Sequence, residues 1–420
     1  MKKYEAYKNS GIEWIGQIPE DWSVVPLKYY LSLKGRIGWN GLKSEEFQEK
    51  SYAYLVTGQD FNSDVVNWEK CYQINKERYD EDPFIQLENG DLLVTKDGTI
   101  GKVAKVVNLD KPACLNSGIF VVKQTKGVFE QNYLYWVLVS NQLKEFVGFN
   151  STGSTIAHLY QNVFENMPLT VPSLKEQHAI ASYLDHKVGQ IDASVSAINT
   201  QIDDLKSYRQ SIISEAVTKG LNPDVPMKDS GVEWIGEIPE SWDCLPMKRG
   251  LTINNGKDYK EIQSDEGYPV IGSGGQFAFA TDYLYDGEAV LLGRKGTIDK
   301  PMYINGKFWT VDTMFYAVPS EDVCCKYMYY QAQTIPFGLY STNTALPSMT
   351  QTDLANSPFC FPSLAEQQNI ADYLDCKTAK IDSTISSLEA QRDDLNALKQ
   401  SIISEAVTGK IDVRDWKPNK

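Results

Sequence analysis

Two short stretches of the chain carry cationic and hydroxyl side chains at matching positions, around Asp97-Gly98 in the first and around Gly296 in the second. Lysine and arginine bind phosphate oxygens, and arginine also hydrogen-bonds the edge of guanine. Serine and threonine hydroxyls can hydrogen-bond either phosphates or base edges. Side chains of these types suit a nucleic-acid surface. The candidates are Lys96, Thr99, Lys102 and Lys105 in the first stretch, and Arg294, Lys295, Thr297 and Lys300 in the second.

A polar loop follows each of these stretches and supplies a second group of candidates. Amide side chains pair with adenine and hydroxyl groups donate to phosphate, so the loops could bind the same ligand. Any single member could equally be a solvated turn residue, whereas the matched placement in both copies distinguishes the two turns. The loop candidates are Ser151, Thr152, Ser154, Thr155 and His158, and then Ser341, Thr342, Asn343 and Gln351.

The sequence offers no arrangement of residues suited to catalysis. It lacks the Asn/Asp-Pro-Pro-Phe/Tyr segment of an amino-methyltransferase and a Gly-x-Gly-x-x-Gly turn after a strand. Gly101-Lys102 resembles the end of a phosphate-binding loop, but Val103 replaces the Ser/Thr and Lys96 stands where the first glycine belongs. We therefore expect a chain that is not an enzyme by itself and that binds neither a metal nor a cofactor.

Short strands are predicted to hold the two turns. Residues 91–107 read as two strands joined at Asp97-Gly98, a dipeptide typical of hairpins, and residues 289–298 are the counterpart. Each candidate turn therefore belongs to a mixed body of strands and helices. Further elements are predicted as buried strands over 119–122 and 314–318, and as helices over 131–146 and 325–334.

A very long helix is predicted over residues 172–220, after the first body. Ser173 and Glu176 form a Ser-x-x-Glu capping box, and Gly220 followed by Pro223 is a normal stop. At 1.5 Å per residue such a helix is roughly 65 Å long, so its apolar stripe needs a partner of equal length. The stripe recurs every three or four residues, at Ile180, Leu184, Val188, Ile191, Val195, Ile198, Ile202, Leu205, Tyr208 and Ile212.

The chain supplies that partner over residues 362–410, at an offset of 190 residues. The segment Ser211–Val217 of the first helix recurs identically as Ser401–Val407 in the second. Two stripe positions are polar, Thr378 and Arg392, and Arg392 either snorkels to the surface or fixes the register of the pair. The apolar members are Ile370, Leu374, Ile381, Ile385, Leu388, Leu395, Leu398 and Ile402.

A second repeat lies outside the helices. The segment Ser10–Trp22 recurs as Ser230–Trp242, at an offset of 220 residues. The chain is therefore two copies of one arrangement: a leading segment, a body and a long helix. The predicted domains are a first body with its leading segment (1–171), a first helix (172–220), a second body (221–361), a second helix (362–410) and a tail (411–420).

The composition is that of an ordinary globular protein, with 42% hydrophobic and 23% charged residues among 420. An apolar run of membrane-spanning length is absent, and the first residues lack the apolar core of a signal peptide. The seven cysteines include no Cys-x-x-Cys pair, so we expect a cytoplasmic protein. The net charge of −14 argues against a general affinity for nucleic acid, although an acidic body can carry a basic face.

The arrangement as a whole resembles one known family. The two long helices open with Pro-Ser-Leu-x-Glu-Gln and close with Ser-Ile-Ile-Ser-Glu-Ala-Val-Thr, and the leading segments read Gly-x-Glu-Trp-Ile-Gly-x-Ile-Pro-Glu-x-Trp. Together with bodies that diverge between the copies, these motifs are similar to those of the specificity subunit of type I restriction-modification systems. The resemblance covers essentially the whole chain.

The resemblance implies an α/β (α+β) fold in which two target recognition domains alternate with two long antiparallel helices that form a coiled coil, with internal pseudo-twofold symmetry. Each recognition domain would read one half of an asymmetric bipartite site on double-stranded DNA. The helices would set the gap and dock two methylation subunits, and restriction subunits would be further partners. S-adenosylmethionine, ATP and Mg²⁺ are then expected on the partner subunits.

A structural coiled-coil adaptor with two ligand-binding bodies is the alternative. Such a protein would present aromatic or apolar patches instead of polar loops, and its binding would be insensitive to salt. A third reading is a stand-alone nuclease or methyltransferase, which an assay of the isolated chain with Mg²⁺ or S-adenosylmethionine would test.

Overall fold

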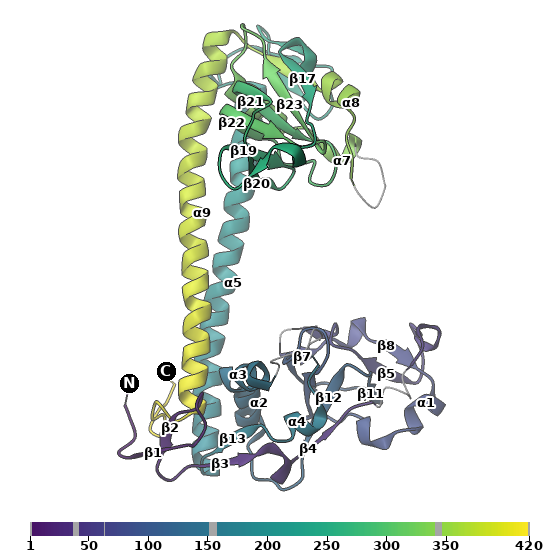
Figure 1. The fold of residues 1–420 in the computed structure, drawn as a ribbon, viewed down its shortest axis with the longest axis vertical. Helices are drawn as coiled ribbons and strands as arrows, with labels where there is room; N and C mark the ends of the chain where they lie inside the picture. Colours follow the sequence, from purple (N-terminus) through teal and green to yellow (C-terminus); the bar gives the residue numbers. More distant parts are fainter. Residues whose placement is uncertain (1, 37–41, 63, 151–157, 341–346, 419–420) are drawn as a thin grey trace. The chain divides into compact units, whose positions relative to one another are not determined.

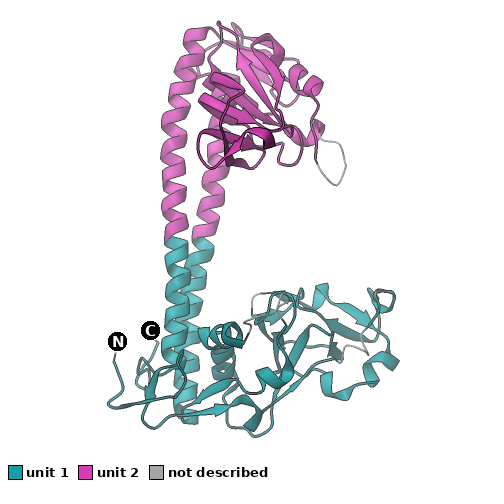
Figure 2. Ribbon diagram, in the orientation of Figure 1, with its two compact units in different colours: residues 1–197, 391–420 teal, residues 198–390 magenta. Residues whose placement is uncertain are grey.

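The computed structural model describes residues 2–36, 42–62, 64–150, 158–340 and 347–418 (Figure 1). It is an α+β fold with two very long helices, α5 (Leu174–Lys219) and α9 (Leu364–Val407), which confirms the predicted fold class. The chain forms two compact units, unit 1 (residues 1–197 and 391–420) and unit 2 (residues 198–390). Each long helix contributes one part to each unit (Figure 2).

The predicted start of α5 is confirmed by its hydrogen bonds. The main-chain N–H of Ser173 donates to Glu176 Oε2 at 3.1 Å, and the N–H of Glu176 donates to Ser173 Oγ at 3.4 Å, so both halves of the capping box are present. At the other end, Gly220 has a φ of +77° and its N–H donates to the carbonyl of Ala216 at 3.2 Å. This left-handed residue stops the helix where the sequence predicted.

Helix α9 ends earlier than the predicted residue 410. Gly409 has a φ of +70°, its N–H donates to the carbonyl of Ala406 at 3.2 Å, and the N–H of Lys410 donates to the carbonyl of Glu405 at 2.8 Å. These two bonds form a Schellman motif, so the last helical residue is Val407. The glycine comes one position earlier than in the first copy, and the helix stops accordingly.

The two long helices run antiparallel within each unit. In unit 1, Thr170, just before α5, donates through Oγ1 to the carbonyl of Val407 at 2.7 Å, and farther along Asp192 Oδ1 lies 2.6 Å from Lys399 Nζ. In unit 2, Arg209 Nε lies 3.0 Å from Asp382 Oδ1. Rising numbers on α5 therefore meet falling numbers on α9, as predicted.

The apolar stripe is confirmed along most of both helices. In unit 2, Ile202, Ile381 and Ile385 form a buried cluster, which the partly buried Ile198, Leu205 and Leu388 extend. Most stripe members of unit 1 join the core of that unit, and these include Ile180, Leu184, Val188, Ile191 and Ile402. Each long helix buries its apolar face on the other, and this packing stabilises helices of such length.

Two predicted stripe members are wrong. Tyr208 is 57% exposed and Leu398 is 46% exposed. Near these positions each helix turns a different face inward, because Ile213 in α5 and Ile403 in α9 are fully buried against the bodies. The bodies, and not the facing helix, decide which side of the last turns is covered. The stripe therefore shifts by one residue, as a period of 3.6 allows.

The two polar stripe positions are accommodated differently. Thr378 is buried, and its hydroxyl donates to the carbonyl of Leu374 at 2.7 Å and lies 3.2 Å from the hydroxyl of Tyr330. Arg392 donates through Nε and a terminal nitrogen to Asp393 Oδ1, each at 3.1 Å, on its own helix. The guanidinium is therefore at the surface, which matches the snorkelling interpretation.

The body of unit 1 is built on two sheets. One has the strand order β4-β12-β9-β10-β7-β6 and the other has the order β11-β5-β8. Strand β3, which follows the leading segment, pairs antiparallel with β13, which directly precedes α5. The strands are β3 (Ser23–Pro26), β4 (Leu31–Lys34), β5 (Ala53–Val56), β6 (Phe61–Asn62), β7 (Val65–Val66), β8 (Tyr72–Ile74), β9 (Leu92–Thr95), β10 (Val103–Lys105), β11 (Ala113–Leu115), β12 (Ile119–Gln124) and β13 (Pro168–Val171).

Helices cover this body and join it to α5. The sequence predicts one helix over 131–146, but Ser140 interrupts it, because its hydroxyl donates to the carbonyl of Val137 and accepts from the N–H of Gln142. A serine that bonds the main chain in this way starts a new helix. The helices are α1 (Lys76–Asp80), α2 (Gln131–Val139), α3 (Asn141–Asn150) and α4 (Gln161–Phe164).

The body of unit 2 has one sheet, in the order β17-β23-β21-β22-β19-β20-β18, and the pair β16–β24 leads to α9. The strands are β16 (Asp243–Pro246), β17 (Leu251–Asn255), β18 (Gln263–Ser264), β19 (Tyr268–Gly272), β20 (Gly275–Ala280), β21 (Tyr285–Gly293), β22 (Met302–Thr310), β23 (Met314–Pro319) and β24 (Pro358–Phe361). The helices are α6 (Cys325–Ala332), α7 (Phe337–Tyr340) and α8 (Gln351–Asn356). The predicted buried strands and the helix near 325 are confirmed.

A buried tyrosine ties each body to the end of a long helix. In unit 1, Tyr133 is fully buried and donates to the carbonyl of Thr170 at 3.0 Å. In unit 2, the equivalent Tyr327 donates to the carbonyl of Cys360 at 3.0 Å and lies 3.3 Å from the carbonyl of Val217. Burial raises the pKa of both phenols, so each remains a neutral donor.

The leading segments form small hairpins, β1 (Tyr7–Asn9) with β2 (Gln17–Pro19) and β14 (Met227–Asp229) with β15 (Glu237–Pro239). Each hairpin is followed by a buried tryptophan that packs against a glycine at the end of a long helix. An added Cβ on Gly409 would lie 3.2 Å from the Trp22 ring, and one on Gly220 would lie 3.1 Å from the Trp242 ring. These glycines therefore meet two demands, a positive φ and close packing.

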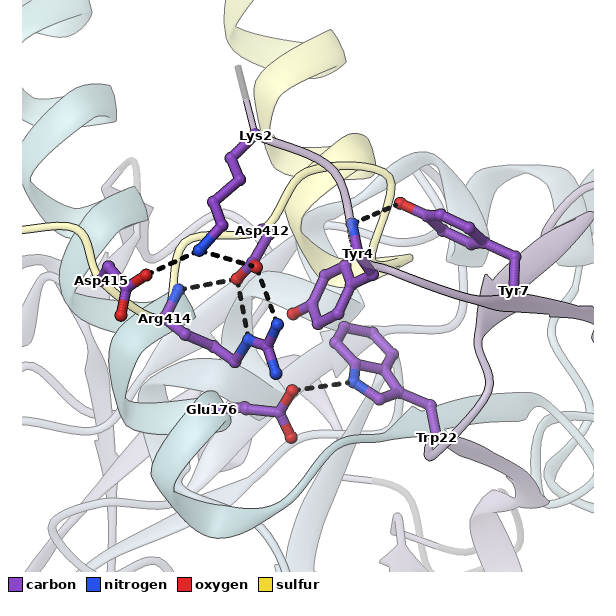
Figure 3. Close-up of polar contacts among 8 residues, drawn as sticks. All are labelled: Lys2, Tyr4, Tyr7, Trp22, Glu176, Asp412, Arg414 and Asp415. Carbon is purple, nitrogen blue, oxygen red and sulfur yellow. Dashed lines mark hydrogen bonds and ion pairs between the residues drawn. The ribbon is translucent and has the colours of Figure 1, made fainter.

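The chain ends meet beside Trp22 in unit 1 (Figure 3). The N–H of Asp412 donates to the carbonyl of Lys2 at 2.9 Å, and Arg414 donates to both carboxylate oxygens of Asp412 at 2.9 and 2.8 Å. Lys2 pairs with Asp415 at 2.7 Å. Trp22 Nε1 donates to Glu176 at 3.3 Å, so the start of α5 belongs to the same cluster.

Among the residues that the structure describes, the helices lack any stretch apolar enough and long enough to cross a membrane.

Candidate nucleic-acid interface

The predicted hairpin of unit 1 is present, with a longer loop than a two-residue turn. Strands β9 and β10 pair antiparallel with Val94 opposite Val103, and the loop between them runs over residues 96–102. The buried Thr95 shapes this loop, because its hydroxyl donates to the carbonyl of Thr99 at 2.5 Å and accepts from the N–H of Lys102 at 3.0 Å. Residues 96–102 are called the hairpin loop of unit 1.

The counterpart in unit 2 connects β21 to β22. These strands pair antiparallel with Leu291 opposite Met302, and the loop runs over residues 294–301. It contains all four predicted residues of this stretch, namely Arg294, Lys295, Thr297 and Lys300. Gly98 and Gly296 take matching positions with φ of +68° and +85°. Both loops therefore have the same left-handed residue at their centre.

The same main-chain bond ties each hairpin loop to the segment that follows the polar loop. In unit 1, the N–H of Leu159 donates to the carbonyl of Lys96 at 2.9 Å, and Asp97 and His158 form a β-bridge. In unit 2, the N–H of Met349 donates to the carbonyl of Arg294 at 3.0 Å, and Lys295 bridges with Ser348. The structure thus brings together two groups of residues that the sequence separates.

A cavity of about 860 Å³ lies against the hairpin loop of unit 1. The predicted residues Thr99 and Lys102 line it. The sequence analysis missed several further polar residues in its wall, among them Gln59, Lys70, Asn116 and the carboxylates Asp60 and Asp97. Amide side chains of this kind can pair with adenine and a lysine with phosphate or guanine, so the cavity wall offers both kinds of contact.

The missed residues follow from the strand order. Gln59 comes shortly after β5 and Asn116 comes directly after β11, and these two strands are parallel neighbours. The N–H of Asn116 donates to the carbonyl of Val56 at 2.9 Å, which fixes both turns at one edge of the sheet. Polar residues directly after two buried apolar runs were a usable signal, but the pairing of the runs is not visible in the sequence.

Three predicted residues of unit 1 do not line this cavity. Lys96 stands 4.9 Å from the centroid of the Phe120 ring, and burial lowers its pKa. Lys105 lies 3.3 Å from Asp64 and 4.3 Å from the centroid of the Tyr135 ring, beyond the loop. His158 is hydrogen-bonded through Nδ1 to Asp97 Oδ1. Lys96 and His158 therefore contact the body or the loop itself, Lys105 lies outside the loop, and Lys102 is the exposed cation on the loop.

A smaller cavity of about 300 Å³ lies at the equivalent place in unit 2. Three predicted residues line it together: Arg294, Lys295 and Gln351. Asn255 and Thr350 are further members that the sequence analysis missed. Gln351 donates through Nε2 to the carbonyl of Ile253 at 2.9 Å, so its carbonyl oxygen is the part left to accept. Lys300 is exposed on the same loop, and Thr297 is half-buried.

Several predicted residues lie outside the described part of the chain. They are Ser151, Thr152, Ser154 and Thr155 of the first polar loop, and Ser341, Thr342 and Asn343 of the second. Among the described residues, no group of three or more His, Cys, Asp and Glu side chains is placed to hold a metal ion.

The two cavities differ in their chemistry although their frames agree. Unit 1 presents Lys70, Lys102, Gln59 and Asn116, whereas unit 2 presents Arg294, Lys295 and Asn255. Arg294 donates to the carbonyl of Asp312 at 3.4 Å and stacks on the Phe315 ring at 5.8 Å, so its guanidinium is oriented in advance. A frame that repeats while its polar side chains change is suited to binding two different sequences of one polymer.

Comparison with known proteins gives a consistent result. The profile of the type I restriction modification DNA specificity domain matches residues 19–204 and 240–393. The MjaVIII specificity subunit of a type I restriction enzyme from Methanocaldococcus jannaschii is 24% identical over 436 residues, which cover 95% of each chain. The StySPI specificity subunit from Salmonella potsdam is 20% identical over 434 residues, covering 96% of this chain and 91% of the relative.

A solved structure has the same fold. It comes from work on complex assembly and conformational transition of the type I R-M system. One chain of that structure superposes on this chain with a TM-score of 0.70. The match covers 94% of this chain and 99% of that one, at 15% identity. The profile, in turn, accounts for well over half of the residues, in two blocks that each contain one body. The chain therefore belongs to the family of type I restriction modification DNA specificity domain proteins.

Proposed function

We propose that this chain is the DNA-specificity subunit of a type I restriction-modification complex. Each body reads one half of an asymmetric, split site on double-stranded DNA, using the hairpin loop and the cavity beside it. The observation that carries the proposal is the repeated bond of Leu159 to Lys96 and of Met349 to Arg294, which holds different side chains in the same frame. Family membership supports the same reading.

The reading side chains fit what direct and phosphate contacts need. Arginine binds guanine, asparagine and glutamine bind adenine, and lysine binds phosphate, and all of these types line the two cavities. Because the net charge is −14, the surface as a whole does not attract DNA, and only local patches can do so. Recognition is therefore local to the loops, and affinity is shared with partner subunits.

The long helices have a mechanical role in this proposal. Within each unit they pack antiparallel through apolar residues over most of the stripe, so they act as a stiff spacer that sets the gap between the half-sites. The helices and the surface near their ends also dock two methylation subunits. Restriction subunits join the same complex when cleavage is required.

The chemistry belongs to the partners. We propose that this chain is not itself catalytic, and that S-adenosylmethionine, ATP and Mg²⁺ act on the methylation and restriction subunits. The side chains that line the two cavities include amide, lysine and arginine groups, which suit hydrogen bonding to DNA.

The test is a methylation experiment with the chain and its methylation subunits, on a plasmid library with random sequence. Single-molecule sequencing of methylated adenines is expected to return one split motif with two unlike halves and a fixed gap. A continuous motif, or two identical halves, would contradict the proposal. The isolated chain with S-adenosylmethionine serves as the control and is expected to methylate nothing.

A further inference from the structure

The strand pair that leads into α9 in unit 2 places two cysteines directly opposite each other. Strands β16 and β24 are antiparallel, and Cys244 of β16 is in register with Cys360 of β24. Just past the strand ends, the N–H of Met247 donates to the carbonyl of Ser357 at 2.8 Å. Hydrogen-bonded and non-hydrogen-bonded pairs alternate along antiparallel strands, and Met247 is three positions from Cys244. The two cysteines therefore form a non-hydrogen-bonded pair.

A non-hydrogen-bonded pair has the spacing that a disulfide needs. Its Cα atoms are about 4.5 Å apart, and disulfides join Cα atoms that are about 4.4–6.8 Å apart. The side chains of residues in register lie on the same face of the strands. Cys244 and Cys360 are free thiols in this structure, and a hydrogen bond joins them. A disulfide can therefore form here without a large movement of the main chain.

Buried side chains of α6 hold the main chain at Cys360 in place. The carbonyl of Cys360 accepts from the Tyr327 hydroxyl at 3.0 Å and from Gln331 Nε2 at 2.7 Å. Both donors are buried, with exposures of 0% and 1%. Because the main chain is already fixed, the two thiols stay close together, and little conformational entropy is lost when a bond forms between them.

The two thiols differ in exposure and in acidity. Cys360 is fully buried, whereas Cys244 is half-buried at the edge of the same core. The hydrogen bond from Cys360 lowers the pKa of Cys244, while the same bond and burial raise the pKa of Cys360. The thiolate is the nucleophilic form of cysteine, so Cys244 is suited to react first with a small oxidant and Cys360 to react second.

The equivalent strand pair of unit 1 has no cysteine. Val24 of β3 and Thr170 of β13 stand opposite each other there. The positions correspond, because Tyr133 donates to the carbonyl of Thr170 as Tyr327 donates to that of Cys360. One copy of the fold therefore forms this strand pair without thiols, and packing alone does not require two cysteines in the other copy.

We propose that Cys244 and Cys360 are a redox-active pair that forms an intrachain disulfide when hydrogen peroxide or another hydroperoxide oxidises Cys244. The Cys244 thiolate attacks one peroxide oxygen and becomes a sulfenic acid, and the other oxygen leaves and takes up a proton to form water. The Cys360 thiol then attacks the sulfenic sulfur, and its hydroxyl leaves as a second water. Two thiols and one hydrogen peroxide thus give one disulfide and two waters. A dithiol reductant reverses the change.

The disulfide joins the strand that follows the second leading segment to the strand that precedes α9. The body of unit 2 between residues 244 and 360 then becomes a closed loop, which restricts the unfolded chain and stabilises the folded body. Neither cysteine lines the cavity beside the hairpin loop of unit 2. Oxidation therefore protects this body against unfolding and leaves its binding surface unchanged, whatever ligand the body binds.

The first test is chemical. The reduced full-length chain is treated with hydrogen peroxide, unfolded, blocked with N-ethylmaleimide and digested for mass spectrometry without reductant. We expect one linked pair of peptides, containing Cys244 and Cys360, that lacks two hydrogen atoms and separates on treatment with dithiothreitol. Cys71 and Cys114 are the internal controls and should stay blocked thiols, because burial raises their pKa to about 12 and about 11. Peroxide treatment that leaves Cys244 and Cys360 unlinked would refute the pair.

The second test uses variants taken from the other copy, Cys244→Val and Cys360→Thr. Both should fold, since the new hydroxyl can donate to the carbonyl of Val217 as Thr170 donates to that of Val407. Peroxide should raise the Tm of unit 2 in the unchanged chain by about 5 °C or more, and dithiothreitol should reverse the rise. Neither variant should show this shift. A rise that persists in Cys244→Val would assign it to other thiols and overturn the inference.

Two controls complete the test. Cys376→Ser removes the exposed thiol of α9 and should keep the full peroxide-dependent rise, whereas loss of the rise would point to a disulfide between two chains. Dimedone, which traps sulfenic acids, should label Cys244 in the Cys360→Thr variant at least tenfold more than Cys360 in the Cys244→Val variant. The opposite result would contradict the assigned order of attack. None of these readouts depends on DNA, so the proposed function can fail while this inference holds.

Discussion

The main-chain N–H of Leu159 donates to the carbonyl oxygen of Lys96 at 2.9 Å, and this bond joins the hairpin loop of unit 1 to a segment that follows α2 and α3 in the chain. Met349 repeats the bond on Arg294 at 3.0 Å in unit 2. Because the bond uses main-chain atoms, it places the loop without requiring particular side chains. Effects of loop substitutions should therefore appear in recognition more than in folding.

Replacing Arg294 and Lys295 by alanine together should relax one half of the split site and leave the other half unchanged. Each lost base contact is worth about 1–3 kcal/mol, which is roughly 5–150-fold in discrimination, whereas a lost phosphate contact weakens binding to all sequences alike. Sequencing of methylated DNA from the reconstituted complex measures both halves at once. Lys228→Ala, on β14 of the same unit, is the control and should change neither half. An unchanged motif in the double variant would show that these residues are not readers.

The complementary change is Gln59→Ala with Asn116→Ala in unit 1. These amides line the larger cavity, so the other half-site should lose discrimination by a similar factor, about 5–150-fold. The half-site that depends on Arg294 should stay intact. Both double variants are assayed on the same library, and an effect of both on one half-site would contradict the assignment of one body to each half.

Lengthening both long helices should change the gap and not the bases. A heptad inserted after Ile198 in α5 and a matching heptad before Leu395 in α9 keep the apolar stripe in phase and add about 10 Å. At 3.4 Å per base pair, the gap should grow by about three base pairs. The methylation motif of the variant gives the answer directly. A heptad in α5 alone leaves its stripe without a partner, and methylation should be lost.

Gly409→Ala should destabilise unit 1 strongly. The residue has a φ of +70°, and an added Cβ would lie 2.3 Å from Pro19 Cδ. Backbone strain and overpacking together should cost about 2–5 kcal/mol. Gly11→Ala is the matched control, because Gly11 has a φ of +78° but no described atom within 4 Å of an added Cβ, so it should cost about 1–2 kcal/mol. Urea unfolding of both variants measures the difference, and equal costs would refute the packing argument.

The contact between Arg414 and Asp412 should make stability depend on pH. The guanidinium hydrogen bonds hold the pKa of Asp412 below its usual range, and the carboxylate is only 1% exposed. A carboxyl group with a lowered folded pKa stabilises the protein above its unfolded pKa of about 3.9, and this contribution disappears as the pH falls through the folded pKa.

Arg414→Ala should therefore lower the free energy of unfolding by about 1–3 kcal/mol at pH 7, and the deficit should shrink as the pH falls below about 4. Urea unfolding from pH 3 to pH 7 follows it. In an Asp412→Asn background the same substitution should have little effect and no pH dependence. A deficit that is constant over this range would mean that the arginine acts by packing on Tyr4, whose ring lies 4.7 Å away.

Local signals predicted the scaffold well because they act over a few residues. The capping box of Ser173 and Glu176 and the left-handed Gly220 set the ends of α5 through bonds that span three or four positions. The spacing of apolar residues every three or four positions predicted most of the apolar stripe, because this spacing is also a local property of the sequence. The stripe failed at Tyr208 and Leu398, where the bodies compete with the facing helix for the buried side, and that competition depends on tertiary packing.

The candidate nucleic-acid interface was only partly predictable. Matching turns drew attention to Lys102 and Arg294, which do line the cavities. The same reasoning could not tell that Lys105 turns toward Asp64, or that Asn116 lies beside Gln59. Both facts follow from which strands are neighbours, and strand order is a long-range property that a single sequence does not display.

The main-chain bond between each hairpin loop and its later segment has an evolutionary consequence. The loop of unit 2 keeps its shape through the carbonyl of Arg294 and the left-handed Gly296, whatever side chains stand at 295 and 297. A point mutation at 295, which lines the cavity, then alters the chemistry of the cavity wall while these main-chain contacts remain. New sequence preferences can arise in single steps, without a compensating change elsewhere in the protein.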